Sequence, residues 1–219
     1  MNKAVELVNE WGKFDEQYPE AGIEDFCRHY LIKKREKENT GEIASGALPP
    51  QIDNVLMKLL GRIASMGQIY SREVLKDIPE IQLESFYYLT TIMQFGESRK
   101  TDIINHHLSE LSTGIDILGR LKESGLIEER ADPSDKRAKL IKVSQKGRQL
   151  LFKCFQRMSK VGSILFDELA DEDKKLCIQL LKNVEIKHAK LALEVKTRGL
   201  NALYSLNPFN ANQQSDDCI

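Results

Sequence analysis

Apolar residues recur at helical spacing along most of the chain. The longest stripe lies between residues 51 and 70 and consists of Ile52, Val55, Leu56, Leu59, Leu60, Ile63, Met66 and Ile69. Comparable stripes cover residues 4–18, 23–31, 79–96, 147–169 and 171–196. Because side chains three and four residues apart share one face of a helix, each stripe predicts an amphipathic helix. The pattern therefore predicts a mostly α-helical protein.

The periodicity changes between residues 125 and 151. Gly125 follows a helical segment and would end it in the left-handed conformation. Residues 126–130 and 139–144 have the character of short strands, and the residues between them, Asp132-Pro133-Ser134-Asp135, are typical of a turn. The second arm and the helix start after it carry only basic charges, namely Lys136, Arg137, Lys139, Lys142, Lys146 and Arg148. A hairpin of this charge is typical of a wing that contacts a phosphate backbone.

These residues carry a resemblance to the MarR family of winged helix-turn-helix transcriptional regulators. The helix end and first strand match as Arg120-Leu121-Lys122-Glu123-Ser124-Gly125-Leu126-Ile127, the turn as Asp132-Pro133-Ser134-Asp135-Lys136-Arg137, and the next helix start as Val143-Ser144-Gln145-Lys146-Gly147. The resemblance extends from about Leu48 to His188. It implies a mostly α fold with a small β-hairpin wing and a helical dimerisation region.

The resemblance places residues 98–108 in a positioning helix and residues 112–124 in the recognition helix. Ser112 is expected to cap the recognition helix, with Ile115, Leu118 and Leu121 facing the core and Ile117 near the outer side. The residues expected to contact DNA are Arg99, Lys100, Ser112, Thr113, Gly114, Asp116, Arg120, Asp135, Lys136, Arg137 and Lys139. In the family an arginine such as Arg137 enters the minor groove, and an aspartate such as Asp135 orients nearby basic side chains. Arg120 could instead pair with an internal acid.

A second implied site is an effector pocket between the dimerisation helices and the DNA-binding lobe. Phe86, Tyr87, Tyr88 and Met93 lie on a helix that would border it, and the family's effectors are phenolic or lipophilic. The alternative is that these four side chains belong to the core. Four scattered cysteines, Cys27, Cys154, Cys177 and Cys218, are expected to be buried thiols, with redox sensing as the alternative.

Composition narrows the functional classes. The net charge of −1 excludes a chain-wide polycation, so any positive field must be local. The sequence has none of the common catalytic or phosphate-cradling motifs, and we expect neither an enzyme nor a cofactor. His106-His107 point to different faces of a helix and are not expected to bind a metal. Charged residues interrupt the N-terminus and no apolar run could span a membrane, so a cytoplasmic protein is expected. Glu128 and Glu129 are expected either to be solvated or to pair with the basic wing.

Three segments are expected. Residues 1–47 form a helical extension whose two helices should dock on the dimerisation region, with a basic arm through Lys33, Lys34 and Arg35 as the alternative. Residues 48–199 form the winged helix and dimerisation domain, and residues 200–219 form a polar, flexible tail. The expected function is a homodimeric repressor that binds a pseudopalindromic double-stranded DNA site and is relieved by an effector or by oxidation. The alternative is a winged-helix protein-interaction module without specific DNA binding.

Overall fold

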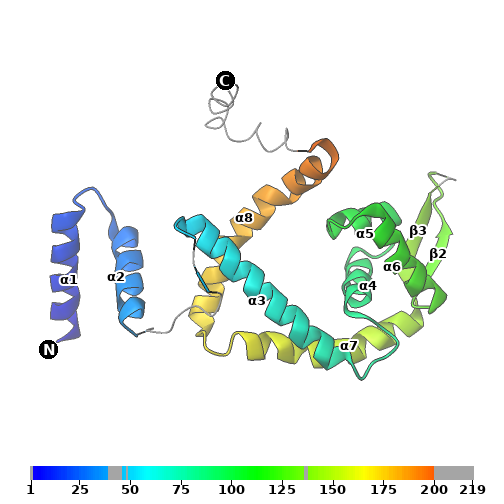
Figure 1. The fold of residues 1–219 in the computed structure, drawn as a ribbon, viewed down its shortest axis with the longest axis horizontal. Helices are drawn as coiled ribbons and strands as arrows, with labels where there is room; N and C mark the ends of the chain where they lie inside the picture. Colours follow the sequence, from blue (N-terminus) through cyan, green and yellow to red (C-terminus); the bar gives the residue numbers. More distant parts are fainter. Residues whose placement is uncertain (1, 39–45, 48, 136–137, 200–219) are drawn as a thin grey trace. The chain divides into compact units, whose positions relative to one another are not determined.

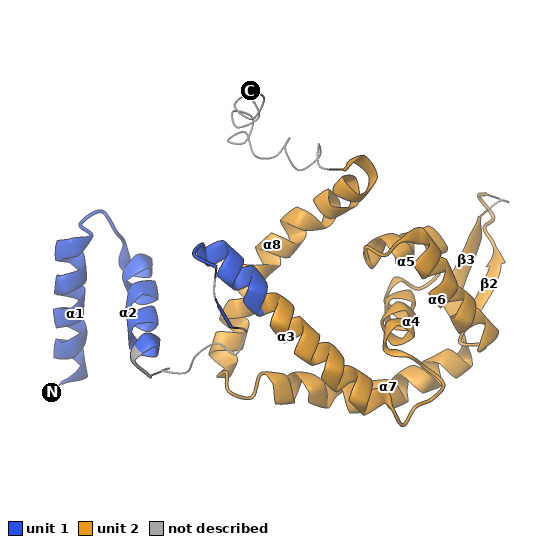
Figure 2. Ribbon diagram, viewed as in Figure 1, with its two compact units in different colours: residues 1–59 blue, residues 60–219 orange. Residues whose placement is uncertain are grey.

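The computed structural model describes residues 2–38, 46–47, 49–135 and 138–199, which form two compact units (Figures 1 and 2). Unit 1 covers Met1–Leu59 and unit 2 covers Leu60–Ile219. The elements in chain order are α1 (Lys3–Gln17), α2 (Ile23–Glu38), α3 (Ile52–Leu75), α4 (Leu83–Phe95), β1 (Ser98–Arg99), α5 (Lys100–His106), α6 (Leu111–Glu123), β2 (Ile127–Ala131), β3 (Lys139–Val143), α7 (Gln145–Leu165) and α8 (Asp171–Arg198). The fold is mostly α-helical with one small sheet, as the sequence predicts.

Helices α1 and α2 pack against each other through an aromatic cluster. The ring of Phe26 lies 5.0 Å from that of Trp11 and 5.5 Å from that of Phe14, both edge-on, and the Phe14 ring lies 5.1 Å from that of His29. Isolated helices of this length are marginal in water, so each helix supplies the apolar partner that the other needs. The two predicted helices are confirmed. Their docking on the dimerisation region stays a prediction.

The core of unit 2 surrounds α4. The side chains that are almost wholly buried come from α4, α5, α6, the sheet and α7, and they are Leu89, Ile92, Ile103, Leu118, Leu121, Leu126, Ile141, Leu151 and Cys154. Because α4 is apolar on most of its surface, it can serve as the centre on which the other elements pack. This core holds α5, α6 and the sheet as one body.

The sheet is antiparallel with the strand order β1-β3-β2. Ile127 pairs with Val143 and Ala131 with Lys139, so β2 and β3 form the predicted hairpin. Ile141 and Val143 are buried while Lys142 is exposed, which is the alternation of a strand with one buried face and confirms the strand character expected for residues 139–144. The third strand, β1, has only two residues and was not predicted, because two residues show no periodicity.

Some of the helix ends agree with those predicted from the sequence, and others do not. Gly125 has φ +68°, and the Gly125 and Leu126 amides donate to the carbonyls of Lys122 and Leu121, which confirms the predicted end of α6. Two predicted starts are wrong. The helix expected from residue 79 begins at Leu83, because Ile78 and Ile81 turn into the core first. Helix α6 begins one residue before Ser112, with Glu110 as its cap.

Within the described residues, no helix is long and apolar enough to cross a membrane.

Candidate nucleic-acid interface

The rotation of α6 is set by a close contact with α5. Gly114 is buried against Ile104, and a Cβ atom at position 114 would lie 2.5 Å from Cγ1 of Ile104. Only a glycine allows the two helices to approach this closely. Gly114, Ile117, Leu118 and Leu121 therefore form the inner face. The placement of Gly114 and Ile117 on the outer side was wrong, and so was the placement of Ile115 in the core, because Ile115 is exposed.

The outer face of α6 follows from this rotation. Successive residues turn by about 100°, so the face opposite the buried set carries Ser112, Asp116, Gly119 and Glu123. Thr113 and Arg120 lie on one flank. Arg120 lines a cleft of about 180 Å³ beside the loop before α4, together with Glu80 and Gln82. This places Arg120 nearer to the body of the lobe than a residue on the outer face would be.

Asp132 organises the turn of the wing. Its Oδ1 accepts hydrogen bonds from the Ser134 amide at 2.8 Å and the Ser134 hydroxyl at 2.7 Å. Its Oδ2 accepts from Arg99, at 3.0 Å from Nε and 2.7 Å from Nη2. The hydrogen bonds from Ser134, followed by Arg99, lower the pKa of the Asp132 carboxyl to about 2. Asp132, which the sequence suggested only as a turn residue, thus also holds a basic side chain, and the role expected for Asp135 stays a prediction.

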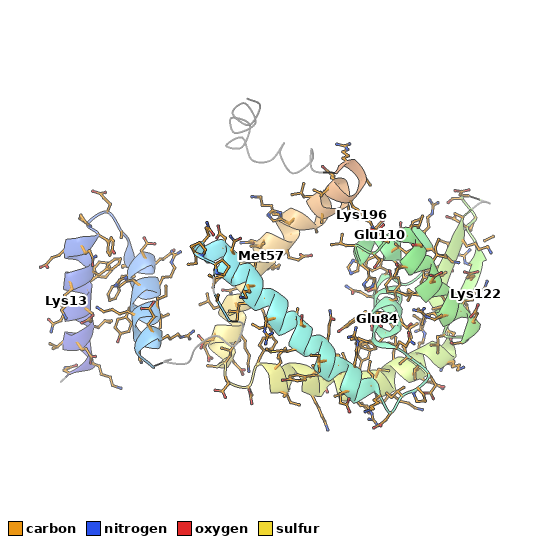
Figure 3. The ribbon with its side chains drawn as sticks, in the orientation of Figure 1. Lys13, Met57, Glu84, Glu110, Lys122 and Lys196 are labelled. Atoms are coloured by element: carbon orange, nitrogen blue, oxygen red, sulfur yellow. The ribbon has the colours of Figure 1, made fainter. Side chains whose placement is uncertain are left out.

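Glu129 gathers three lysines from three elements. Its side chain is 7% exposed, and its carboxylate pairs with Lys100 of α5, with Lys122 of α6 at 2.6 Å and with Lys139 of β3 at 3.8 Å (Lys122 is labelled in Figure 3). Burial alone would raise the pKa of Glu129, but the ion pairs with Lys100 and Lys122 outweigh it and lower the pKa to about 2. The expected pairing of this acid with the basic wing is confirmed, and it also includes both helices of the helix-turn-helix.

Further ion pairs join the strands at their exposed face. Glu128 pairs with Lys142 at 3.2 Å, and Glu97 pairs with Arg130. The first pair joins the neighbouring strands β2 and β3, and the second joins the residue before β1 to β2, so that it links the two outer strands of the sheet. Lys139 and Lys142 therefore project from a braced strand and not from a loop.

Three of the residues expected to contact phosphate lie on one surface. Arg99, Lys100 and Lys139 line an open depression of about 470 Å³ between α5 and β3, with Thr101 and Ala138. Arg99 caps α5, Lys100 is its first residue and Lys139 begins β3, so the sheet register fixes all three. Lys136 and Arg137 at the tip lie outside the described residues. The depression is positive and open to solvent, as a seat for a phosphate backbone requires.

The end of α8 reaches the loop before α6. The Lys196 ammonium donates to the Ser109 carbonyl and lies 3.6 Å from a Glu110 carboxylate oxygen (Figure 3). Because Glu110 caps α6, this contact joins the last helix to the start of the recognition helix.

The four residues expected at an effector pocket do not share one face. Phe86 and Tyr88 are buried in the core, whereas Tyr87 and Met93 are exposed. Tyr88 stacks on His107, with ring centroids 4.2 Å apart. A role in effector binding for any of the four stays a prediction.

His106 and His107 show no sign of a shared ligand site. The Nε2 atom of His107 lies 2.9 Å from the Thr91 hydroxyl, and burial, followed by the charge of His106, lowers the pKa of His107. Within the part of the chain that the structure describes, no group of three histidine, cysteine or acidic side chains could hold a metal ion.

The cysteines differ in exposure. Cys154 is buried, and burial raises the pKa of its thiol to about 11. Cys27 and Cys177 are exposed, so the expectation of buried thiols was wrong for these two. Cys218 lies outside the described residues.

Acid should destabilise the wing through Glu129 and Asp132. Their folded-state pKa values of about 2 lie below the ordinary 4.5 and 3.8, so the unfolded chain binds protons more readily. The stabilisation is present above the ordinary values and is lost as the pH falls toward 2. We expect thermal melts followed by circular dichroism to show the melting temperature falling across this window, and Glu129→Gln to weaken that dependence. Glu123→Gln is the matched control, and equal acid sensitivity in Glu129→Gln and the wild type would contradict the assignment.

Comparison with known proteins agrees with this geometry. Residues 81–147 match the winged helix DNA-binding domain family. The HTH-type transcriptional repressor IacR of Pseudomonas putida is 27% identical over 111 residues, which is 51% of this chain and 61% of the repressor. The alignment thus spans less than two thirds of that relative.

Solved structures share the fold. A mutant MarR from Escherichia coli in complex with operator DNA has a TM-score of 0.55 at 22% identity, covering 59% of this chain and 92% of that one. BpsR of Bordetella bronchiseptica, whose DNA binding is regulated by 6-hydroxynicotinic acid, has a TM-score of 0.56 at 19% identity, covering 62% and 96%. The matching domain and this shared fold show that residues 81–147 form a winged helix DNA-binding domain, and that the chain is similar in fold to MarR regulators.

Proposed function

We propose that this protein is a sequence-specific transcriptional repressor that binds double-stranded DNA as a homodimer. The observation that carries the proposal is the positive depression of Arg99, Lys100 and Lys139 beside the exposed face of α6. A recognition helix in the major groove and a cationic wing on the adjacent backbone is the arrangement that such a surface fits. The repressor relative and the operator complex of MarR support the assignment.

The wing tip supplies the first test. A guanidinium inserted into a narrow minor groove gains from its concentrated negative potential. We expect Arg137→Ala to weaken binding to a duplex enriched from random DNA by about 1–3 kcal/mol, without a change in melting temperature. A gel-shift titration at fixed salt measures this. An unchanged affinity would remove Arg137 from the interface.

Exposed apolar surface supports the dimer. Helix α8 buries none of its residues, and Ile178, Leu180, Val184 and Ile186 are all more than half exposed. Helix α3 exposes Ile69 and Tyr70 as well. Patches of this kind on a single subunit are typical of an interface with a partner. Two-fold symmetry would place two recognition helices about 34–36 Å apart, in successive major grooves.

We expect sedimentation to give a dimer at micromolar protein concentration, with no folded monomer, because the interface would be large and apolar. The salt concentration should change this result little. A stable folded monomer under these conditions would contradict the obligate dimer.

Repression would be relieved by a change in the spacing between the DNA-binding lobes of the two subunits. A small phenolic or lipophilic effector, or oxidation, that favours a spacing unsuited to DNA would lower affinity without altering a base contact. The contact of Lys196 with Ser109 and Glu110 offers a route, because it joins α8 to the cap of the recognition helix.

A protein-interaction module without specific DNA binding is the second candidate. The exposed acids Asp116 and Glu123 on the outer face of α6 favour it, because each repels phosphate. The salt dependence of duplex binding separates the two functions.

A further inference from the structure

The outer face of the recognition helix presents a carboxylate where bases would be read. Asp116 lies opposite the buried face of α6, one turn after Ser112. Its direction is fixed by packing, because Gly114 locks α6 against Ile104 and Leu118 is buried in the core. Asp116 therefore belongs to a rigid element, as a residue that discriminates between bases must.

The charge of Asp116 is not balanced by a cation among the described residues. Acids of the wing and strands are paired with cations: Glu129 with three lysines, Asp132 with Arg99 and Glu97 with Arg130. Within the described residues, Asp116 makes no hydrogen bond or ion pair. A bare carboxylate near DNA weakens binding to every sequence through repulsion of phosphates. It favours binding only where it accepts a hydrogen bond from a base.

The chemistry of the major groove selects the base. A carboxylate can only accept, and guanine and thymine present acceptors there. Adenine presents an amino group beside the N7 acceptor, which repels a carboxylate. Cytosine presents its N4 amino group and no acceptor. We propose that Asp116 is a specificity-determining residue that accepts a hydrogen bond from the N4 amino group of a cytosine in each half of the DNA site. This inference rests on the proposed function.

The neighbouring residues fit a base-reading surface. Leu111 and Ile115 are exposed and lie one turn apart on the flank of α6 opposite to Thr113 and Arg120, beside Ser112 and Gly119 of the outer face. Apolar side chains in the major groove contact the thymine methyl group. Gly119, one turn after Ile115, has no atom within 4 Å of the position of a Cβ, so it leaves room for a base edge or the backbone to approach.

The experiment is selection of bound duplexes from random DNA by the full-length protein and three variants, at one salt concentration. The wild type should enrich a motif with a required cytosine in each half-site. Asparagine pairs with the amino group and N7 of adenine, so the motif selected by Asp116→Asn should carry adenine at the position where the wild type requires cytosine. The motif selected by Asp116→Ala should show no base preference at that position. Glu20→Gln removes the same charge from the exposed loop between α1 and α2, outside the recognition helix, and it should select the wild-type motif.

The outcomes separate this inference from the proposed function. A wild-type motif that Asp116→Asn leaves unchanged overturns the cytosine assignment and leaves the repressor intact. A wild type that enriches no sequence overturns both. If melting curves show that a variant does not fold, the cytosine assignment is tested with the wild-type protein and altered duplexes. Replacing the required C·G pair by G·C should then weaken its binding by about 5- to 150-fold, and a motif without a required cytosine contradicts the assignment.

Discussion

Gly147→Ala is expected to lower the free energy of unfolding by about 3 kcal/mol, the upper end of the usual cost of overpacking. Gly147 lies in the first turn of α7, where the helix crosses the base of the wing. A Cβ atom there would lie 2.3 Å from the Leu126 carbonyl oxygen and 2.8 Å from Cγ1 of Val143. The carbonyl cannot move away cheaply, because it also accepts the Ser144 amide at 3.0 Å.

The same substitution should disturb DNA binding, because both wing strands begin or end at this contact. Gly162→Ala in the same helix is the matched control. Nothing lies within 4 Å of its Cβ position, so alanine should leave stability unchanged or raise it by up to about 1 kcal/mol. Denaturant unfolding of both variants measures the difference. Equal stability of the two variants would show that the contact at Gly147 is not tight.

Asp132→Ala is expected to lower DNA affinity at least as much as the loss of a base contact. The carboxylate closes the turn through Ser134 and holds Arg99 at the positive depression. Without it, a half-exposed guanidinium loses its fixed position and the Ser134 amide loses its acceptor. We expect a loss of about 1–3 kcal/mol of stability, since a hydrogen-bonded group loses its partners. Gel shift and thermal melting of the same preparation measure both effects.

Asp132→Asn separates geometry from charge. Asparagine keeps an acceptor oxygen for Ser134 but removes the ion pair with Arg99. We expect it to keep most of the stability and to lose part of the DNA affinity. If Asp132→Ala binds DNA as tightly as the wild type, Arg99 is not held there for phosphate contact.

The wing could be predicted from the sequence because its signals are local. Gly125, the turn around Pro133 and the alternation of Ile141 and Val143 each act within a few residues. The partners of Asp132 and Glu129 could not be predicted. Arg99 is 33 residues from Asp132, and only the sheet register brings them together.

The rotation of α6 shows the limit of periodicity. Ile115, Ile117, Leu118 and Leu121 fit two overlapping apolar faces, and the spacing alone does not choose between them. The choice is made by Gly114, whose missing side chain allows close approach to Ile104. Hydrophobicity carries no signal for such a contact. The error moved Gly114 to the DNA side and Ile115 to the core.

The salt dependence of duplex binding tests the central claim most directly. If Arg99, Lys100, Lys139 and the wing tip contact phosphates in both subunits, each contact releases a counterion from the DNA. We expect log K to fall linearly with log salt with a slope of about −4 to −9, as for about 5–10 phosphate contacts. A slope near zero, or no retention of any duplex at low salt, would contradict a DNA-binding regulator and favour the protein-interaction module.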